Sequence, residues 1–290
     1  MIEMIVVIVL AAIVVGFVGM FMTAPMNAYL SQTRRADFTD SSTRLVRTIS
    51  NDVSAALPNS VVLKKVGNDV FITVLHTLAS STYKTVVNGG EELTIKAAPD
   101  AAFTAMGALV APNPPFAPLI LNPPFLVVGN LGTPGNDAYQ PGSVITNNVV
   151  VVNPLSPPAP AEEPQIAINA PVGFSFQVAS PSNRVYAVDG PISYWCSPTT
   201  RTFTRYAGHS IAAVAGNPTT PALWAGAISS VLASNVQICA ARFDSVTLAT
   251  AGRGVGGLLS LTVTLNKPAT AADSGETFTV FQQLRIEGEL

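Results

Sequence analysis

Charged side chains are scarce in this chain, and so are the side chains that bind metals. Asp, Glu, Lys and Arg make up 11% of its 290 residues, whereas about 25% is usual in soluble domains. Fifteen basic and seventeen acidic residues leave a formal net charge of −2. The sequence has no basic stripe of the kind that binds nucleic acid, so we expect no nucleic-acid partner.

Histidine and cysteine each occur only twice, as His76, His209, Cys196 and Cys239. The histidines have no partners at metal-ligand spacing, so no zinc or iron site can be assembled from the sequence. We expect no cofactor and no metal site of that kind, and we leave a calcium site in the carboxyl-containing loops open. Two cysteines are enough for one disulfide in an oxidising compartment, with two buried free thiols as the alternative.

A long hydrophobic run at the N-terminus is the strongest feature of the sequence. From Met4 to Met22, nineteen consecutive residues are Ala, Val, Ile, Leu, Met, Phe or Gly. As a helix this run would be about 28 Å long, close to the roughly 30 Å hydrocarbon core of a bilayer. It is longer than the apolar part of a signal peptide and lacks the basic flank of one. We predict a membrane-spanning helix within residues 1–24, with a buried helix of a soluble protein as the alternative.

An amphipathic pattern follows Pro25. Its apolar positions recur at steps of seven and four residues, which places them on one face of a helix: Phe38, Leu45, Ile49, Val53 and Leu57. Charged residues occupy the other face: Arg34, Arg35, Asp37, Asp40, Arg44, Arg47 and Asp52. Asp40 and Arg44 have the spacing of a helical ion pair. We expect one helix to continue over residues 25–57 and to end at Leu57, because Pro58 disfavours helical geometry in the residue before it.

One acidic residue, Glu3, precedes the hydrophobic run. Burying an unpaired carboxylate in hydrocarbon costs at least a few kcal/mol. Glu3 can avoid that cost by lying at the membrane interface or by pairing with a cation. The first basic residue of the chain is Arg34, so a cationic partner would have to come from another chain.

The first fifteen residues, MIEMIVVIVLAAIVV, resemble the N-terminal motif of type IV pilins and of the pseudopilins of type II secretion. In that family a prepilin peptidase removes a basic leader that ends in glycine, and then methylates the new N-terminus. Ile2 and Glu3 match the family's isoleucine and glutamate, whereas Met1 stands in place of leucine. The leader and the phenylalanine and threonine of the motif are missing, which a start assigned at a leucine codon would explain. The resemblance implies that Glu3 acts in assembly, by pairing with the N-terminal amino group of a neighbouring subunit.

Four later segments resemble minor pilins of the MshO, PilW and PulJ kind, in the same order along the chain. They are RTISNDVSAALPNSV, VVGNLGTPGNDAYQPG, SPSNRVYAVDGPISYWC and RYAGHSIAA. The resemblance implies a subunit that helps to initiate or cap a type IV pilus of the MSHA kind. It also implies a single-pass protein of the inner membrane with a periplasmic domain, which is later carried on the filament. Its partners would be other major and minor pilins, contacted through the N-terminal helix.

Beyond Asn59 the sequence predicts strands. SVVLKKV and DVFITVLHT flank Gly67-Asn68, which is a hairpin signal. Further strands are predicted in GFSFQVA, RVYAV, ISYWC, RTFTRYA, NVQICAARF, LLSLTVTL and TFTVFQQLRIE. Their short connections imply antiparallel pairing. The predicted fold class is therefore α+β, a long helix packed on an antiparallel sheet domain over residues 58–290.

Turn residues and prolines separate these strands. We expect a turn at Asp189–Pro191, a flexible loop in GRGVGG at Gly252–Gly257, and surface loops or linkers in the proline-rich stretches 111–125 and 153–164. We also predict that Cys196 and Cys239 form a disulfide that joins the strand ending SYWC to the strand VQICAARF.

No catalytic residue is predicted. GHSIA at Gly208–Ala212 is similar to a nucleophile elbow, but the second glycine is missing and no histidine follows Ser210. We therefore expect a structural subunit and not an enzyme. Two alternatives stay open: a minor pseudopilin of a type II secretion system, and a stand-alone membrane-anchored extracytoplasmic binding module or hydrolase.

Overall fold

The structure is a computed structural model. It describes residues 2–85, 92–93, 95, 102–106, 125–133, 135–140, 165–167, 175–215, 224, 226–244, 247–248, 253–254, 256–267 and 275–288. Its helices and strands are α1 (Ile2–Ser54), β1 (Val62–Val66), β2 (Asp69–Tyr83), β3 (Ala102–Met106), β4 (Phe125–Val128), β5 (Gln165–Ala167), β6 (Arg184–Ser197), β7 (Thr202–Ala207), α2 (Ala212–Ala215), β8 (Ile228–Ser234), β9 (Val236–Phe243), β10 (Thr247–Leu248), β11 (Arg253–Gly254), β12 (Gly257–Lys267) and β13 (Glu276–Ile286).

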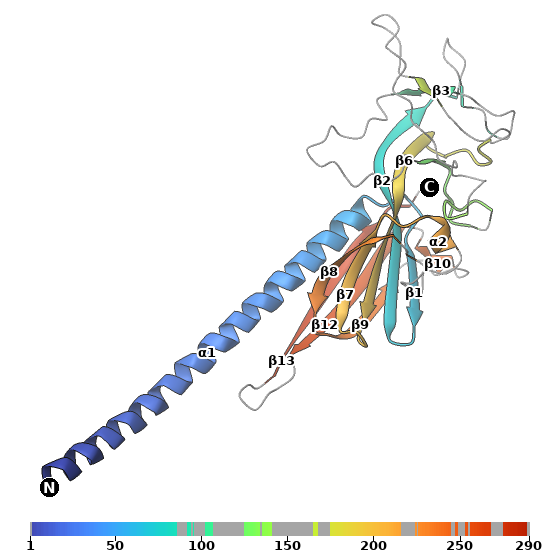
Figure 1. Cartoon of the computed structure of the whole chain (residues 1–290). Coiled ribbons are helices and arrows are strands. Elements are labelled where there is room, and N and C mark those ends of the chain that lie inside the picture. The colour runs from blue at the N-terminus through green and yellow to red at the C-terminus, as the bar shows by residue number, and fades with distance from the viewer. Residues whose placement is uncertain are drawn as a thin grey trace, which may run out of the picture.

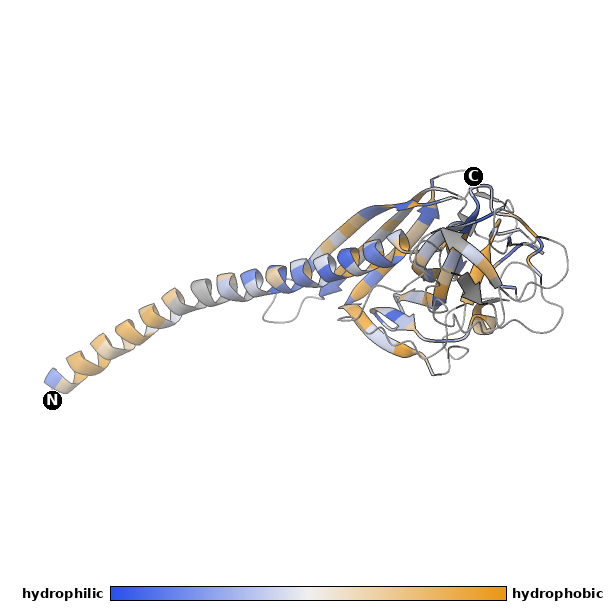
Figure 2. Cartoon of the chain, turned by 90° about the horizontal axis from the view of Figure 1, so that it is seen from above, coloured by the Kyte–Doolittle hydropathy of each residue, from blue (hydrophilic) through white to orange (hydrophobic). Residues whose placement is uncertain are grey.

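Helix α1 is continuous from Ile2 to Ser54 and extends far beyond the strands (Figure 1). After its hydrophilic first turn, the outer part of α1 is coloured hydrophobic in Figure 2, whereas hydrophilic and hydrophobic residues mix in its second half. The second half lies alongside β8 and β13. The predicted apolar and amphipathic segments are thus parts of one helix, which continues through Pro25.

The helix ends at Ser54, three residues before the predicted end at Leu57. The next residues pair with β2 instead. The Leu57 N–H donates to the carbonyl of Leu75 at 2.7 Å, and the Thr77 N–H donates to the carbonyl of Ala55 at 2.8 Å. These bonds satisfy backbone groups that a further helical turn would have used. The predicted helix end was therefore wrong, although Leu57 is buried as expected.

The strands form two sheets. The larger sheet has the order β10-β11-β1-β2-β6-β7-β8, with β3 paired to β2, β4 to β6, and β5 to β3. The smaller sheet has the order β13-β12-β9. Every ladder between these named strands is antiparallel, as predicted from the short connections. An apolar N-terminal helix followed by antiparallel sheets is compatible with the predicted α+β class.

The main hydrophobic core lies between the two sheets and includes one face of α1. The predicted stripe contributes Phe38, Leu45, Ile49 and Val53, which are all buried. They share this core with apolar residues of β2, β6, β7, β8, β9, β12 and β13. Phe38 also stacks on Phe278 of β13, with ring centroids 6.3 Å apart. Burial of each such side chain contributes roughly 1.5–3 kcal/mol, so the stripe is sufficient to hold the second half of α1 on the sheets.

The prediction of a turn at Asp189–Pro191 was wrong, because these residues lie within strand β6. Arg184–Ser197 form one strand through this stretch, and its register against β2 shifts between His76 and Thr77. Gly190 has a φ of 141°, which favours glycine. The stretch is therefore a β-bulge. Bulges and turns use the same residue types, so the sequence pattern did not distinguish them.

The other predicted strands had mixed outcomes. The β1–β2 hairpin forms at Gly67, and β7, β9, β12 and β13 lie in predicted segments. Within GRGVGG, where a flexible hairpin loop was predicted, Arg253–Gly254 form the short strand β11. Among the described residues of GFSFQVA, Phe176 makes an isolated bridge to Ile95 in place of a strand. The proline-rich stretches 111–124 and 153–164 lie outside the described residues.

Candidate functional site

The apolar segment Ile2–Phe21 of α1 is exposed along its whole length. Its large hydrophobic side chains between Ile2 and Phe21 are 49–80% exposed. This segment has 20 residues and a mean hydropathy of 3.0, and none of it is buried. By length and composition it could form a single membrane span.

Glu3 lies in the first turn of α1, and its side chain is exposed. An acidic side chain is favoured there by the positive end of the helix dipole. Among the described residues, none forms an ion pair with its carboxylate. The first basic residue along the same helix, Arg34, lies about 46 Å away at 1.5 Å per residue. No basic side chain along the described part of α1 therefore lies within reach of Glu3.

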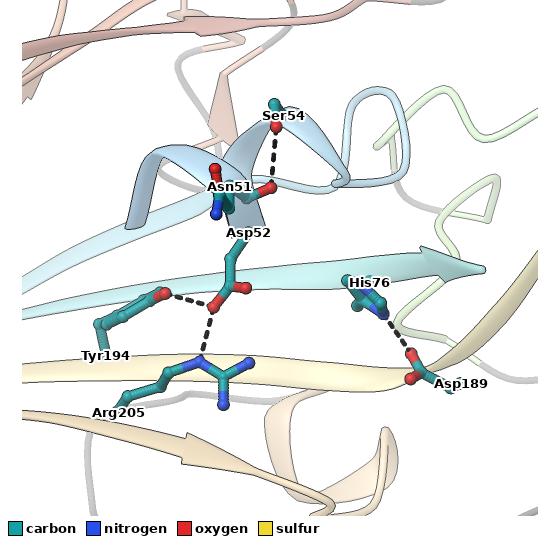
Figure 3. Close-up of polar contacts among 7 residues, drawn as sticks. All are labelled: Asn51, Asp52, Ser54, His76, Asp189, Tyr194 and Arg205. Carbon is teal, nitrogen blue, oxygen red and sulfur yellow. Dashed lines mark hydrogen bonds and ion pairs between the residues drawn. The ribbon is translucent and has the colours of Figure 1, made fainter. Parts of the chain in front are cut away.

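The other end of α1 carries a polar cluster, which Figure 3 shows. Asp52 Oδ2 accepts a hydrogen bond from Arg205 Nε of β7 at 2.6 Å, and another from the Tyr194 hydroxyl of β6. The side chains of Asp52 and Arg205 are 13% and 26% exposed, so Asp52, which the sequence places on the charged face of the helix, is largely buried against β6 and β7. A carboxylate in the last turn of a helix is disfavoured by the helix dipole, and Arg205 compensates for this.

The pKa values of this cluster follow from its partial burial. Burial raises the pKa of Tyr194, and the neighbouring charge of Asp52 raises it further, so the phenol stays protonated and donates its O–H. Burial acts to lower the pKa of Arg205, but the hydrogen bond and charge of Asp52 outweigh this effect and raise it. The cluster is thus an ion pair with a neutral phenol at physiological pH.

A second polar pair lies at the bulge, where His76 Nδ1 and Asp189 Oδ1 are 2.9 Å apart (Figure 3). The hydrogen bond to Asp189 raises the pKa of His76, and partial burial opposes that effect without cancelling it. A cavity of about 230 Å³ is lined by both members of this pair and by Arg205. One cavity is thus lined by the His76–Asp189 hydrogen-bonded pair and by Arg205, which is the cationic member of the pair at the end of α1.

Ser210 does not form a nucleophile site with a histidine. Its Oγ accepts the Ala213 N–H at 3.3 Å, which caps α2. The neighbouring His209 instead bonds through Nε2 to Ser193 Oγ at 3.0 Å, and Ser193 bonds to Thr73 at 2.8 Å.

The Ser193–His209 pair is a buried hydrogen-bonded contact. Its members are 0% and 3% exposed, and burial lowers the pKa of His209 to about 4. His209 Nδ1 has no hydrogen-bond partner in the part of the chain that the structure describes. A nucleophile and its base need access to substrate and a third group that orients the base, and this pair has neither.

Cys196 of β6 and Cys239 of β9 form the predicted disulfide, with Cα atoms 6.1 Å apart. Because β6 belongs to the larger sheet and β9 to the smaller, the bond ties the two sheets together through the core. Over the ranges that the structure describes, no three His, Cys, Asp or Glu side chains gather as possible metal ligands.

The Asp52–Arg205 pair was not predicted from the sequence, although two features of the sequence pointed to it. Arg205 lies within the strand TFTRYA, whose other large residues, Phe203 and Tyr206, are aromatic. Asp52 directly precedes Val53 of the buried stripe, and it is an acidic residue where the helix dipole favours a basic one. Pairing these two observations would have required knowing that β7 lies beneath the end of α1.

Comparisons with models of protein families, with curated proteins and with solved structures find no match to this chain. The functional assignment therefore depends on the helix, on the geometry of the β-domain and on the resemblance of the N-terminal motif.

Proposed function

We propose that this chain is a minor pilin, a non-enzymatic subunit that helps to initiate or cap a type IV pilus of the MSHA kind. The observation that carries the proposal is the division of α1 into two parts. Residues 2–21 are exposed and, apart from Glu3, apolar, whereas one face of its second half is held in the core of the β-domain. A subunit built this way can keep one folded domain while the protruding helix exchanges one apolar environment for another.

Before assembly, that environment would be the inner membrane. The segment Ile2–Phe21 is long enough for one span. The disulfide between Cys196 and Cys239 fits a domain on the oxidising, periplasmic side. After assembly, the same apolar surface would be covered by the helices of neighbouring pilins, because exposure of this surface to water is unfavourable. The β-domain would then contact neighbouring subunits laterally or stand at the tip.

The role of Glu3 in this proposal follows from the transfer of the apolar helix from the membrane into the filament. In the membrane its carboxylate can stay hydrated at the interface, because it lies at the end of the span. In the core of a filament water is excluded, and the cost of a lone charge rises. The N-terminal amino group of a neighbouring subunit supplies the opposite charge, and their attraction is strong in a low dielectric. Prepilin peptidase would produce that amino group by removing a leader.

The proposal is tested by following the chain into filaments. A tagged chain is expressed from its gene, with the upstream leader codons, in piliated cells, and the cells are fractionated into membranes and sheared filaments. A matched control replaces residues 2–21 with an unrelated apolar span of the same length without a carboxylate. We expect both proteins in the membranes and only the native helix in the filaments.

Absence of the native chain from filaments that contain other pilins would overturn the proposal. Recovery only with filaments made by a type II secretion system would assign the chain to the pseudopilins, which use the same helix in the same way.

A further inference from the structure

The cavity of about 230 Å³ lies where β2, β6 and β7 meet the start of β8. Its polar lining is His76, Asp189 and Arg205, and its apolar lining includes Pro191, Ile192 and Ile228. The cavity is distant from the exposed half of α1. Filament formation through that helix therefore does not explain why polar side chains line the cavity.

Arg205 lines this cavity and has donors beyond the Nε that binds Asp52. Its Nε is bonded to Asp52 Oδ2 at 2.6 Å, which fixes the guanidinium from one side. Figure 3 shows its two terminal nitrogens turned away from Asp52. Among the described residues, its hydrogen-bond partners are the Asp52 carboxylate, bound through Nε, and the Tyr194 hydroxyl, which itself bonds to Asp52. A planar fork of N–H donors matches the two oxygens of a carboxylate.

The bulge in β6 builds another wall of the cavity. In the pairing with β2, Gly190 lies opposite His76 and Val188 opposite Thr77, so Asp189 is the extra residue. Its carboxylate is thereby directed to His76. Bulges are frequent beside functional sites, where they change the direction of a side chain. The β-bulge in β6 and the guanidinium of Arg205 are independent observations, and both concern residues that line this cavity.

Charge and size restrict what the cavity can hold. Asp52 neutralises the charge of Arg205, and the Asp189 carboxylate is hydrogen-bonded to His76. The cavity therefore has no excess of positive charge, and a ligand would be bound through the terminal donors of Arg205. The volume lies below the roughly 300–1,000 Å³ of pockets for drug-sized ligands. It equals about eight water molecules at roughly 30 Å³ each. That is the size of a short organic acid or of one acidic side chain.

We propose that this cavity binds a carboxylate group. The two terminal nitrogens of Arg205 hold its oxygens, and its short apolar chain contacts Pro191, Ile192 and Ile228. The carboxylate belongs either to a free short-chain acid or to an acidic side chain of another polypeptide, and both present the same chemistry to Arg205.

The test is isothermal titration calorimetry, in which propionate is titrated into the full chain in detergent micelles. Propionamide, which has the same shape and no charge, is the control ligand. Arg205→Lys keeps a cation opposite Asp52 but removes the fork. Arg242→Lys is the matched control, because Arg242 pairs with Asp244 on the exposed surface at 2.8 Å. We expect saturable propionate binding that Arg205→Lys weakens about tenfold or more, and that Arg242→Lys leaves unchanged.

A second variant keeps the test informative if Arg205→Lys fails to fold. Ile228→Phe narrows the cavity from the exposed start of β8 without altering a charge, and we expect it to weaken propionate binding as well. A blocked Ala-Glu-Ala peptide distinguishes the two sources: tighter binding than propionate indicates a polypeptide, and weaker binding indicates a free acid. The proposal is overturned if neither carboxylate binds saturably, or if propionate binds equally to Arg205→Lys.

Discussion

Replacing Asp52 with alanine should weaken the attachment of α1 to the β-domain. The substitution removes the ion pair with Arg205 and the hydrogen bond from Tyr194. Arg205 would then keep its charge in a place that is only 26% exposed, without a counter-ion. We expect the free energy of unfolding to fall by about 3 kcal/mol.

This magnitude combines two losses and one gain. A hydrogen bond to a charged group is worth roughly 1.5–3 kcal/mol, and Asp52 accepts one from each of two partners. Breaking a fully buried ion pair costs about 3–5 kcal/mol, but water reaches both side chains here and lowers that cost. Removing a carboxylate from the last turn of the helix raises the free energy of unfolding by about 0.5 kcal/mol, because the helix dipole disfavours a negative charge there.

Thermal unfolding of the full chain in detergent, followed by near-ultraviolet circular dichroism, measures the effect. A loss of about 3 kcal/mol lowers the melting temperature by roughly 6–12 °C for a domain of this size. Asp40→Ala is the matched control, because Asp40 pairs with Arg44 at 2.7 Å on the same helix but the two side chains are 74% and 56% exposed. It should cost less than about 0.5 kcal/mol. Equal effects of the two substitutions would refute the reasoning.

Three further predictions concern the core and the histidine within it. Replacing Cys196 and Cys239 with alanine opens a loop with a sequence separation of 43, and should cost about 4 kcal/mol in urea unfolding through lost chain-entropy restriction. Burial lowers the pKa of His209 from 6.5 to about 4, so its neutral form stabilises the fold above pH 6.5 and this stability is lost as the pH falls through 4. Wild type should therefore lose about 3 kcal/mol relative to His209→Gln over that range, as measured by urea unfolding at each pH. A chain beginning at Gln32 should be soluble and folded, whereas one beginning at Ser60 should melt at a lower temperature because it exposes the core that α1 covers.

Each of these predictions has an outcome that contradicts it. Alkylatable thiols in the unreduced wild-type protein, detected by mass spectrometry, would exclude the disulfide. A stability difference between wild type and His209→Gln that does not change with pH would show that His209 does not titrate differently on folding. Equal melting temperatures of the two truncated chains would show that α1 does not stabilise the sheets.

The helix and its buried stripe could be predicted from sequence because both depend on local pattern. The composition of residues 2–21 and the spacing of Phe38, Leu45, Ile49 and Val53 are features of one continuous segment, and the structure buries all four. The Asp40–Arg44 pair likewise needs only helical geometry. The disulfide could be predicted because the chain has two cysteines and one possible pairing within it.

The helix end and the bulge could not be predicted, because they depend on pairing between distant segments. Pro58 permits a helix as far as Leu57. Hydrogen bonds from the residues after Ser54 to β2 form in place of the last turn of that helix. Asp189–Pro191 contains turn residues, and only the neighbouring strand decides whether the chain reverses or bulges. The Asp52–Arg205 contact joins residues 153 positions apart. Such a contact has no local period, so the sequence showed two unusual charges without showing that they meet.

The assembly role proposed for α1 depends on one carboxylate, Glu3. Glu3→Ala, made in the gene with its leader codons, leaves the apolar span unchanged, so membrane insertion and leader cleavage should be preserved. Asp40→Ala serves as a control for the loss of an acidic side chain elsewhere on the same helix. If Glu3 were only an interfacial residue, both variants would behave alike.

The measurement is the amount of each tagged variant in sheared pili relative to the membranes of the same cells. We expect wild type and Asp40→Ala to be incorporated equally, and Glu3→Ala to remain in the membrane with little protein in the pili. That result follows if Glu3 must pair with a neighbouring N-terminus in a medium of low dielectric. Wild-type amounts of Glu3→Ala in purified pili would contradict the pairing.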